Sequence, residues 1–462
     1  MKKIAIVIIT FIGVFNTSYA QETEEVFSLE EFLAMVKKYH PIVAQADLEI
    51  TAAEAKLLKS RGAFDPTLTG SMKEKNFKET EYYSLWKGSF KIPTWYGIDL
   101  KAGYEQNEGY YLNPEHTTPE NGIWSAGVSI SLAKGLLYND RMNALRQAKI
   151  LQKKTLVQRD IMVASIIAEA AQTYADWLYY FQNKTVIEEF LENAKIRYEG
   201  VAKSSRLGET PAIDTVETKI TVRKRELELK QAELKLQKAK LKLSNYLWID
   251  NIPLELEDRL QPMADVINFK DVLEIEQLLG NANDLTNHPK LRSLGYDLDS
   301  YNLDVKLKQN NLLPTINLEY NFLSPEIDET NYISTDNYKA GLKVKLPLFL
   351  RKERGDLKLA KAKRDQAEYK IKQSRWKLTN KVKATEQEIF SLQEQLQITN
   401  DIVSDSEVMV AAEKRLFEVG ESSIFYINTR ENKLIDAILK KNKIANELNT
   451  AITKLYESLR IN

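Results

Sequence analysis

The chain carries Phe64-Asp65-Pro66-Thr67-Leu68 in its first half and Leu312-Leu313-Pro314-Thr315-Ile316 in its second half. The dipeptide His40-Pro41 recurs as His288-Pro289 at the same offset of 248 residues (314 − 66 and 288 − 40). Each half then continues in one order: a helical stretch, alternating strands, a very long helix, a turn with glycine, and another helix. A repeat of this size that mixes strand and helix periods predicts a duplicated α+β chain rather than a short-repeat solenoid.

Six segments alternate strictly between apolar and polar side chains, which is the pattern of a strand with one apolar and one wet face. Four lie in the first half and two in the second: 67–73, 86–92, 98–104, 124–132, 315–322 and 338–346. In an outer-membrane barrel the apolar face meets lipid and the polar face lines the lumen. Aromatic residues near the strand ends, and connections that alternate between short and long, favour the barrel. A soluble sandwich remains the alternative.

Two very long helices are expected, because 64 residues pass without Gly or Pro from 136 to 199 and again from 356 to 419. At about 1.5 Å per residue, each would form a rod of roughly 96 Å. We expect a first repeat over 21–248, a mixed connecting subdomain over 249–283 and a second repeat over 284–462. The expected helices are 29–61, 136–199, 212–248, 284–312, 356–419 and 424–460, with strands within 67–132 and 315–346.

The N-terminus has the pattern of a secretory signal peptide over residues 1–20. Lys2 and Lys3 precede an apolar run from Ile4 to Phe15, and Ser18-Tyr19-Ala20 fits cleavage before Gln21. A short membrane anchor is the alternative, although the run is too short to span a bilayer comfortably. Beyond residue 20 no apolar stretch reaches 18 residues, so the exported chain is expected in the periplasm, outside the cell or in the outer membrane.

Composition argues against several classes of function. The 65 basic and 65 acidic side chains balance, which disfavours nucleic acid as a partner. The chain has no cysteine and only three histidines, none at a metal-ligand spacing from another, so we expect no metal and no cofactor. No nucleotide-binding loop or nucleophile constellation indicates an enzyme.

Together these motifs resemble the TolC-type outer-membrane efflux family over nearly all of the mature chain. The resemblance is carried by the two His-Pro pairs, by the helix-to-strand connections around Pro66 and Pro314, and by two further pairs of motifs. These are the strand-to-helix connections Leu132-Ala133-Lys134-Gly135-Leu136 and Leu346-Pro347-Leu348-Phe349, and the hairpin tips Arg206-Leu207-Gly208-Glu209 and Glu418-Val419-Gly420-Glu421. Each motif is weak alone, but all eight occur in order and in duplicate.

The resemblance implies an α+β membrane protein that works as a homotrimer. Three chains would jointly form a β-barrel in the outer membrane, in contact with its lipid, that continues into a long periplasmic α-helical barrel. It implies a passive exit duct for small molecules or polypeptides, in a tripartite efflux or type I secretion system with a periplasmic adaptor and an inner-membrane transporter. The first half departs from the family by showing four strands instead of two. If 86–104 joins the barrel, a trimer has 18 strands rather than 12; an extra hairpin outside the barrel is the alternative.

The resemblance also implies sites at the periplasmic end. Asp214 matches a constriction aspartate of the family, and three such carboxylates would attract cations in a narrow pore. A solvated Asp214 that complements its helix dipole is the alternative. The matching second-half residues, Tyr426 and Thr429, are not acidic, and Tyr426 would narrow the pore sterically. The tip residues expected to meet the adaptor are Leu207, Gly208, Glu209, Val419, Gly420 and Glu421.

A different function stays open at this stage: a periplasmic adaptor-like coiled-coil protein of such a system, which is also rich in helical hairpins. Adaptors usually carry one hairpin and compact β domains rather than duplicated alternating strands. The two histidines before proline, His40 and His288, are expected to act as turn or capping residues rather than as ligands.

Overall fold

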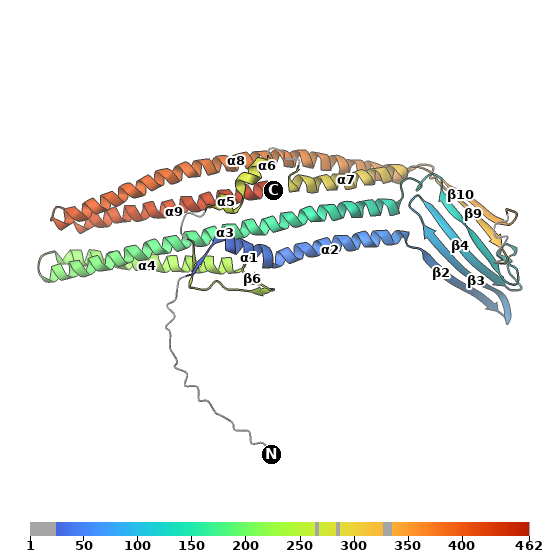
Figure 1. The fold of residues 1–462 in the computed structure, drawn as a ribbon, viewed down its shortest axis with the longest axis horizontal. Helices are drawn as coiled ribbons and strands as arrows, with labels where there is room; N and C mark the ends of the chain where they lie inside the picture. Colours follow the sequence, from blue (N-terminus) through green and yellow to red (C-terminus); the bar gives the residue numbers. More distant parts are fainter. Residues whose placement is uncertain (1–24, 264–267, 283–286, 327–334, 462) are drawn as a thin grey trace, which may run out of the picture. The chain divides into compact units, whose positions relative to one another are not determined.

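The computed structural model describes residues 25–263, 268–282, 287–326 and 335–461 (Figure 1). The predicted signal peptide lies outside these residues. The long helices are α3 (Asp140–Arg206) and α8 (Arg351–Glu418), which are followed by α4 (Ala212–Ser244) and α9 (Ile424–Arg460). The shorter elements are β1 (Glu25–Phe27), α1 (Leu29–Tyr39), α2 (Pro41–Arg61), η1 (Gly62–Phe64), η2 (Pro114–His116), β6 (Trp248–Ile249), β7 (Ile252–Pro253), β8 (Leu260–Pro262), α5 (Phe269–Val272), α6 (Ile275–Ala282) and α7 (Pro289–Asn310).

Six strands form one antiparallel sheet in the order β10-β9-β5-β4-β3-β2, drawn side by side in Figure 1. Their bounds are β2 (Thr67–Phe77), β3 (Thr80–Pro93), β4 (Ile98–Glu108), β5 (Ile123–Ser131), β9 (Thr315–Ser324) and β10 (Tyr338–Lys345). The β5–β9 pairing, in which Val128 faces Tyr320, joins the two halves of the chain. The extra hairpin of the first half, β3 and β4, therefore lies inside the sheet and not outside it.

The predicted helix 29–61 is wrong, because the chain forms two helices separated at His40. His40 is extended (φ −66°, ψ 132°), and its Nδ1 accepts a hydrogen bond from the backbone N–H of Ile42 at 3.3 Å. Pro41 has no N–H to donate into a continuing helix and disfavours helical backbone before it. His288 caps α7 in the same way, with Nδ1 accepting from Lys290 N–H at 3.2 Å. The expected capping role of both histidines is confirmed.

Several predicted helix ends are also displaced. The long helices were expected to lie between glycines, but α3 passes through Gly200 to Arg206, and α8 begins at Arg351, before Gly355. A single glycine costs a helix only about 1 kcal/mol, which long neighbouring turns can absorb. Helix α4 ends at Ser244 instead of 248, where β6 begins to form. Helix α7 is observed over Pro289–Asn310 rather than 284–312, and residues 284–286 lie outside the described residues.

The connecting segment is mixed in structure. β6 and β7 form a small hairpin, and β8 pairs in parallel with β1, with Glu25 opposite Leu260. β7 ends at Pro253, and Leu254 donates its N–H to Leu247 O at 2.9 Å. Two short helices, α5 and α6, follow further along this segment.

The chain divides into two compact units, and each draws on both sequence repeats. The first comprises the described residues of Met1–Val36, Ala170–Asn268 and Leu396–Asn446; the second those of Lys37–Glu169, Phe269–Gln395 and Glu447–Asn462. The first unit has an apolar core made by α3, α8 and α9: Phe190, Val403, Val410, Leu434, Ile435 and Ala437. The second unit has separate small clusters, one around Leu57 and Leu145 and one around Leu291 and Leu378. Among the described residues, no helix is both long and apolar enough to cross a membrane.

Candidate functional site

The two helix-hairpin tips are copies of one turn. Gly208, between α3 and α4, and Gly420, between α8 and α9, both have φ of +79°. In the first tip Glu209 N–H donates to Ser204 O at 3.0 Å, and in the second Glu421 N–H donates to Leu416 O at 2.9 Å. This six-residue hydrogen bond and a left-handed glycine define a Schellman-type helix end, which satisfies carbonyls that the helix leaves open.

The tips present apolar side chains to solvent. Leu207 is 66% exposed and Val419 is 70% exposed, while Glu209 and Glu421 beside them are exposed acids. Six predicted tip residues thus sit at the two turns, with one bulky apolar residue before each glycine and one acid after it.

The predicted constriction residues lie just beyond these turns. Asp214 is half-buried in the first turn of α4, where its carbonyl accepts a hydrogen bond from Thr218 Oγ1 at 2.9 Å. Tyr426 is 54% exposed in α9, and Thr429 Oγ1 donates to Phe425 O at 2.8 Å. The hydrogen bonds and ion pairs of the described residues join none of these three side chains to one another.

Sequence reasoning missed a buried polar cluster behind the tips. Glu431 in α9, 4% exposed, forms an ion pair with Arg197 of α3 and a longer one of 3.5 Å with Lys414 of α8. Arg197 Nη1 also donates to Asn428 Oδ1 at 3.0 Å, and Asn428 Nδ2 donates to Glu217 of α4 at 3.4 Å. One cluster therefore ties α3, α4, α8 and α9 together.

A signal for this cluster does exist in the sequence. The run Asn428-Thr429-Arg430-Glu431-Asn432 interrupts an otherwise apolar helical stripe that includes Ile427 and Leu434. Buried polar groups need partners, so such a run on an inward face predicts partners on neighbouring helices. A second buried polar contact lies nearby. Arg225 of α4, 5% exposed, donates to Glu228 at 2.5 Å and to Asn432 of α9.

The polar face of the sheet in the second unit carries ordered ion pairs. Lys91 pairs with Asp99 at 2.9 Å, Lys101 pairs with Glu319 at 2.9 Å, and Lys87 pairs with Glu105. All of these side chains except Asp99 line a hollow of about 520 Å³ on this face.

The long connection after β4 folds back over the hollow. Asn107 Nδ2 donates to His116 O at 2.8 Å, and Asn107 N–H donates to Thr118 Oγ1 at 3.1 Å. His116 and Thr118 also line the hollow, so this connection belongs to the polar side of the sheet.

The opposite face of the sheet is apolar and exposed. Leu68 is 82% exposed, Leu342 65%, Val344 61% and Trp86 53%. Their alternation with polar residues is the one predicted from the sequence. An apolar face of this extent is not stable in water and requires lipid or another protein surface.

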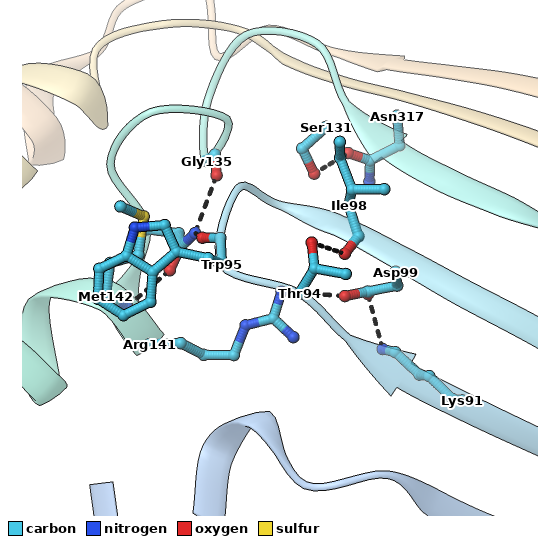
Figure 2. A network of polar contacts seen from close by, with 11 residues as sticks. Lys91, Thr94, Trp95, Ile98, Asp99, Ser131, Gly135, Arg141, Met142 and Asn317 are labelled. Atoms are coloured by element: carbon cyan, nitrogen blue, oxygen red, sulfur yellow. Dashed lines mark hydrogen bonds and ion pairs between the residues drawn. The ribbon is translucent and has the colours of Figure 1, made fainter. Parts of the chain in front are cut away.

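The turn between β3 and β4 is fastened to the start of α3 (Figure 2). Asn139 caps α3 by accepting from Met142 N–H at 2.8 Å, and its Nδ2 donates to Trp95 O at 3.3 Å. Arg141 contacts Asp99 of β4 at 3.0 Å. Gly97 has φ of +57°, and a Cβ there would meet Gly135 O at 2.4 Å, so no other residue fits. The extra hairpin is thus anchored where sheet meets helix.

The described residues offer no group of three or more His, Asp or Glu side chains placed to hold a metal ion. Both ring nitrogens of the buried His288 have partners. Nδ1 caps α7 by accepting from Lys290 N–H, and Nε2 lies 3.2 Å from Ser458 O. Burial lowers the pKa of His288, which favours the neutral ring. Burial raises the pKa of Tyr174 to about 12, while its hydroxyl donates to Phe27 O at 2.7 Å.

Comparison with known proteins finds one family model that matches part of the chain. The family model described as outer membrane efflux protein matches residues 282–459. A search among curated proteins finds no significant match.

Solved structures match nearly the whole chain in fold. The CmeC outer membrane channel of Campylobacter jejuni has a TM-score of 0.64 at 14% identity, covering 93% of this chain and 85% of that one. The outer membrane protein VceC of Vibrio cholerae has a TM-score of 0.66 at 14% identity, covering 93% and 95%. The open state of the MtrE channel of Neisseria gonorrhoeae has a TM-score of 0.64 at 13% identity, covering 93% and 88%.

The resemblance inferred from the motifs is confirmed, since residues 282–459 match the efflux family in sequence and over nine-tenths of the chain matches its channels in fold. The same matches support the predicted location in the outer membrane, with an extended helical part.

Proposed function

We propose that three copies of this chain form a passive exit duct through the outer membrane. The observation that carries the proposal is the six-stranded sheet, with one exposed apolar face and one hollowed polar face. Lipid would cover the first face and water would fill the second, as in an outer-membrane barrel wall.

The sheet has two open edges that suit closure by copies of itself. Strand β2 has 11 residues and β10 has 8, and every one of them is exposed. Successive strands are antiparallel across the sheet, so in a set of six the two edges run in opposite directions. The β10 edge of one chain can therefore pair antiparallel with the β2 edge of the next. Unpaired edges do not persist in lipid, and closure by three chains would give 18 strands.

The helical hairpins would form the periplasmic end of the duct. The exposed tip residues Leu207 and Val419, with their glycine turns, would dock a periplasmic adaptor. Asp214, Tyr426 and Thr429, just beyond the tips, would line a constriction. Energy would come from an inner-membrane transporter, in a tripartite efflux or type I secretion system, and the duct would pass small molecules or polypeptides.

Cysteine cross-linking tests the closure, because the natural chain has no cysteine to interfere. Variants combine one cysteine in β2, at Ser71 or Lys73, with one in β10, at Gly341 or Lys343. Oxidation of outer membranes should convert the monomer band to dimers and trimers on a non-reducing gel. Single-cysteine variants and a pair placed within the central strand β5, at Ser125 and Ser129, are the controls and should stay monomeric.

Fractionation separates the duct from the adaptor-like alternative. We expect the chain to remain with outer membranes until detergent is added. Release into the periplasm by osmotic shock alone, together with the absence of cross-linked trimers, would refute the duct and favour a soluble adaptor.

A further inference from the structure

We infer that the barrel of this duct selects for anions, because lysines of the two edge strands lack carboxylate partners and gather where the chains join. The inference rests on the proposed trimer and adds the class of solute that the duct admits. It begins from how charge is distributed on the polar face of the sheet.

The inner strands balance their charges. All three carboxylates on the polar face of the six strands, Asp99, Glu105 and Glu319, have a lysine partner on a neighbouring or nearby strand. Asp99 is additionally held by Arg141. These residues neutralise one another and leave little net field in the middle of the sheet.

The edge strands carry lysines and no carboxylate on the same face. Register places two lysines of β2 and three of β10 on the polar side: Lys73, Lys75, Lys339, Lys343 and Lys345. All five are exposed. Lys75 lies over the ring of Tyr82 at 4.6 Å, and Lys339 is near the already paired Glu319. Lys73, Lys343 and Lys345 form no ion pair with any carboxylate of the described residues.

These lysines span the height of the sheet. Lys345 pairs across to Thr315, at the end of the sheet next to the helices, and Lys343 pairs to Asn317. Lys73 pairs to Leu85, towards the opposite end, where β2 turns into β3. Pairing β2 of one chain with β10 of the next would bring both sets to one seam, so a trimer would have three basic stripes along its lumen.

A low-dielectric wall with one sign of charge concentrates counter-ions and excludes ions of the same sign. Each stripe contains lysines without local compensation, so small anions and anionic solutes should pass in preference to cations.

The test measures ion selectivity of the full chain, purified as a trimer and reconstituted in planar lipid bilayers with a potassium chloride gradient. The wild type should show a reversal potential of anion selectivity, with a chloride-to-potassium permeability ratio above ~3. The Lys73→Gln/Lys343→Gln/Lys345→Gln variant should bring the ratio to about 1. The control, Lys87→Gln/Glu105→Gln, removes an ion pair without changing net charge and should keep the wild-type ratio.

A second measurement does not depend on an open periplasmic end. The trisulfonate dye pyranine is titrated into the detergent-solubilised trimer at low salt and followed by fluorescence anisotropy. The triple variant should bind it at least ~10-fold more weakly than the wild type and the control variant. Wild-type cation selectivity, or equal dye binding by the triple variant, would overturn the inference. Failure of the chain to form trimers would instead refute the proposed duct.

Discussion

The two hairpin tips have the same backbone, but the helices behind them do not have the same interior. Helix ends match at an offset of 212 residues: α3 ends at 206 and α8 at 418, and α4 begins at 212 and α9 at 424. The buried cluster breaks this symmetry. Positions equivalent to Arg197 and Glu431 are Met409 and Lys219, both of which lie at the surface. The turn is thus a duplicated part, whereas the buried Arg197–Glu431 pair has no counterpart at the equivalent positions.

The largest effect is expected from a substitution in the buried Arg197–Glu431 pair. Glu431→Ala leaves Arg197 buried without its partner, and loss of one member of a buried pair costs about 3–5 kcal/mol. Hydrogen exchange of the α9 amides should report a local opening free energy lowered by that order. The matched control is Lys219→Ala, at the equivalent exposed position of α4, which should change the same quantity by less than about 0.5 kcal/mol. Equal losses of opening free energy in Glu431→Ala and Lys219→Ala would show that the buried cluster does not hold the two hairpins together.

The turns themselves should respond equally. Nothing lies within 4 Å of a Cβ added at Gly208 or at Gly420, so only the left-handed φ opposes a side chain. Gly208→Ala and Gly420→Ala should each cost about 1–2 kcal/mol locally, and asparagine should cost less at both sites. Hydrogen exchange at 203–210 and at 415–422 measures this. A large difference between the tips would contradict their structural equivalence.

Bulk at the turns should affect assembly more than stability. Gly208→Val or Gly420→Val should abolish capture of the adaptor while leaving trimers intact, if the tips dock as proposed. Co-purification with the adaptor, alongside the trimer content of outer membranes, measures the two quantities separately. Unchanged drug susceptibility and unchanged capture would rule out docking at these turns.

The cap at His288 makes the stability of the chain depend on pH. Burial lowers the pKa of His288 below its usual 6.5, so the unfolded chain binds the proton more readily than the folded one. The stabilisation is fully present above pH 6.5 and is lost as the pH falls towards the lower folded-state pKa. The melting temperature should therefore fall as the pH is lowered over this range. The loss of stability should be smaller than that caused by the glycine variants. His288→Asn keeps a capping group and should remove this part of the slope, while His116→Asn in an exposed loop should keep it.

The smallest effect is expected at the constriction. Asp214→Asn removes a carboxylate that would attract cations, so it should raise the chloride-to-potassium permeability ratio of the trimer by about 2-fold. Tyr426→Phe, at the position equivalent by the 212 offset, removes only a hydroxyl and should leave the ratio unchanged. Bilayer recordings with both variants test the two residues. An equal change in both would assign the effect to the helix ends rather than to the carboxylate.

Much of this fold could be predicted because its signals are local. Strict alternation identified all six strands, and the glycine tips could be located because only glycine suits a left-handed helix end. Helix ends were less predictable, since long helices tolerate Gly200 and Gly355 in their interiors. The break at His40 could have been predicted from Pro41, which disfavours helical backbone in the residue before it.

The candidate site was predicted only in part, and the reason is distance along the chain. Arg197 and Glu431 are 234 residues apart, so no local pattern links them. The β5–β9 pairing that joins the halves also links residues far apart in the sequence, so no local pattern predicts it. The unpaired lysines of β10 could be seen as a stripe in the sequence, but their lack of partners required the strand order.

The extra hairpin of the first repeat implies a rule for how the proposed trimer could change the width of its barrel. Inserting one strand would make the two edges of the sheet run in the same direction, and copies could no longer close by antiparallel pairing. Insertions must therefore come as whole hairpins, which adds six strands to a trimer at a time. Because barrel diameter grows roughly linearly with strand number, a step from 12 to 18 widens the bore by about half and roughly doubles its area. In the proposed trimer, the width of the bore would therefore change only in steps of one hairpin per chain, and β3 and β4 form one such hairpin.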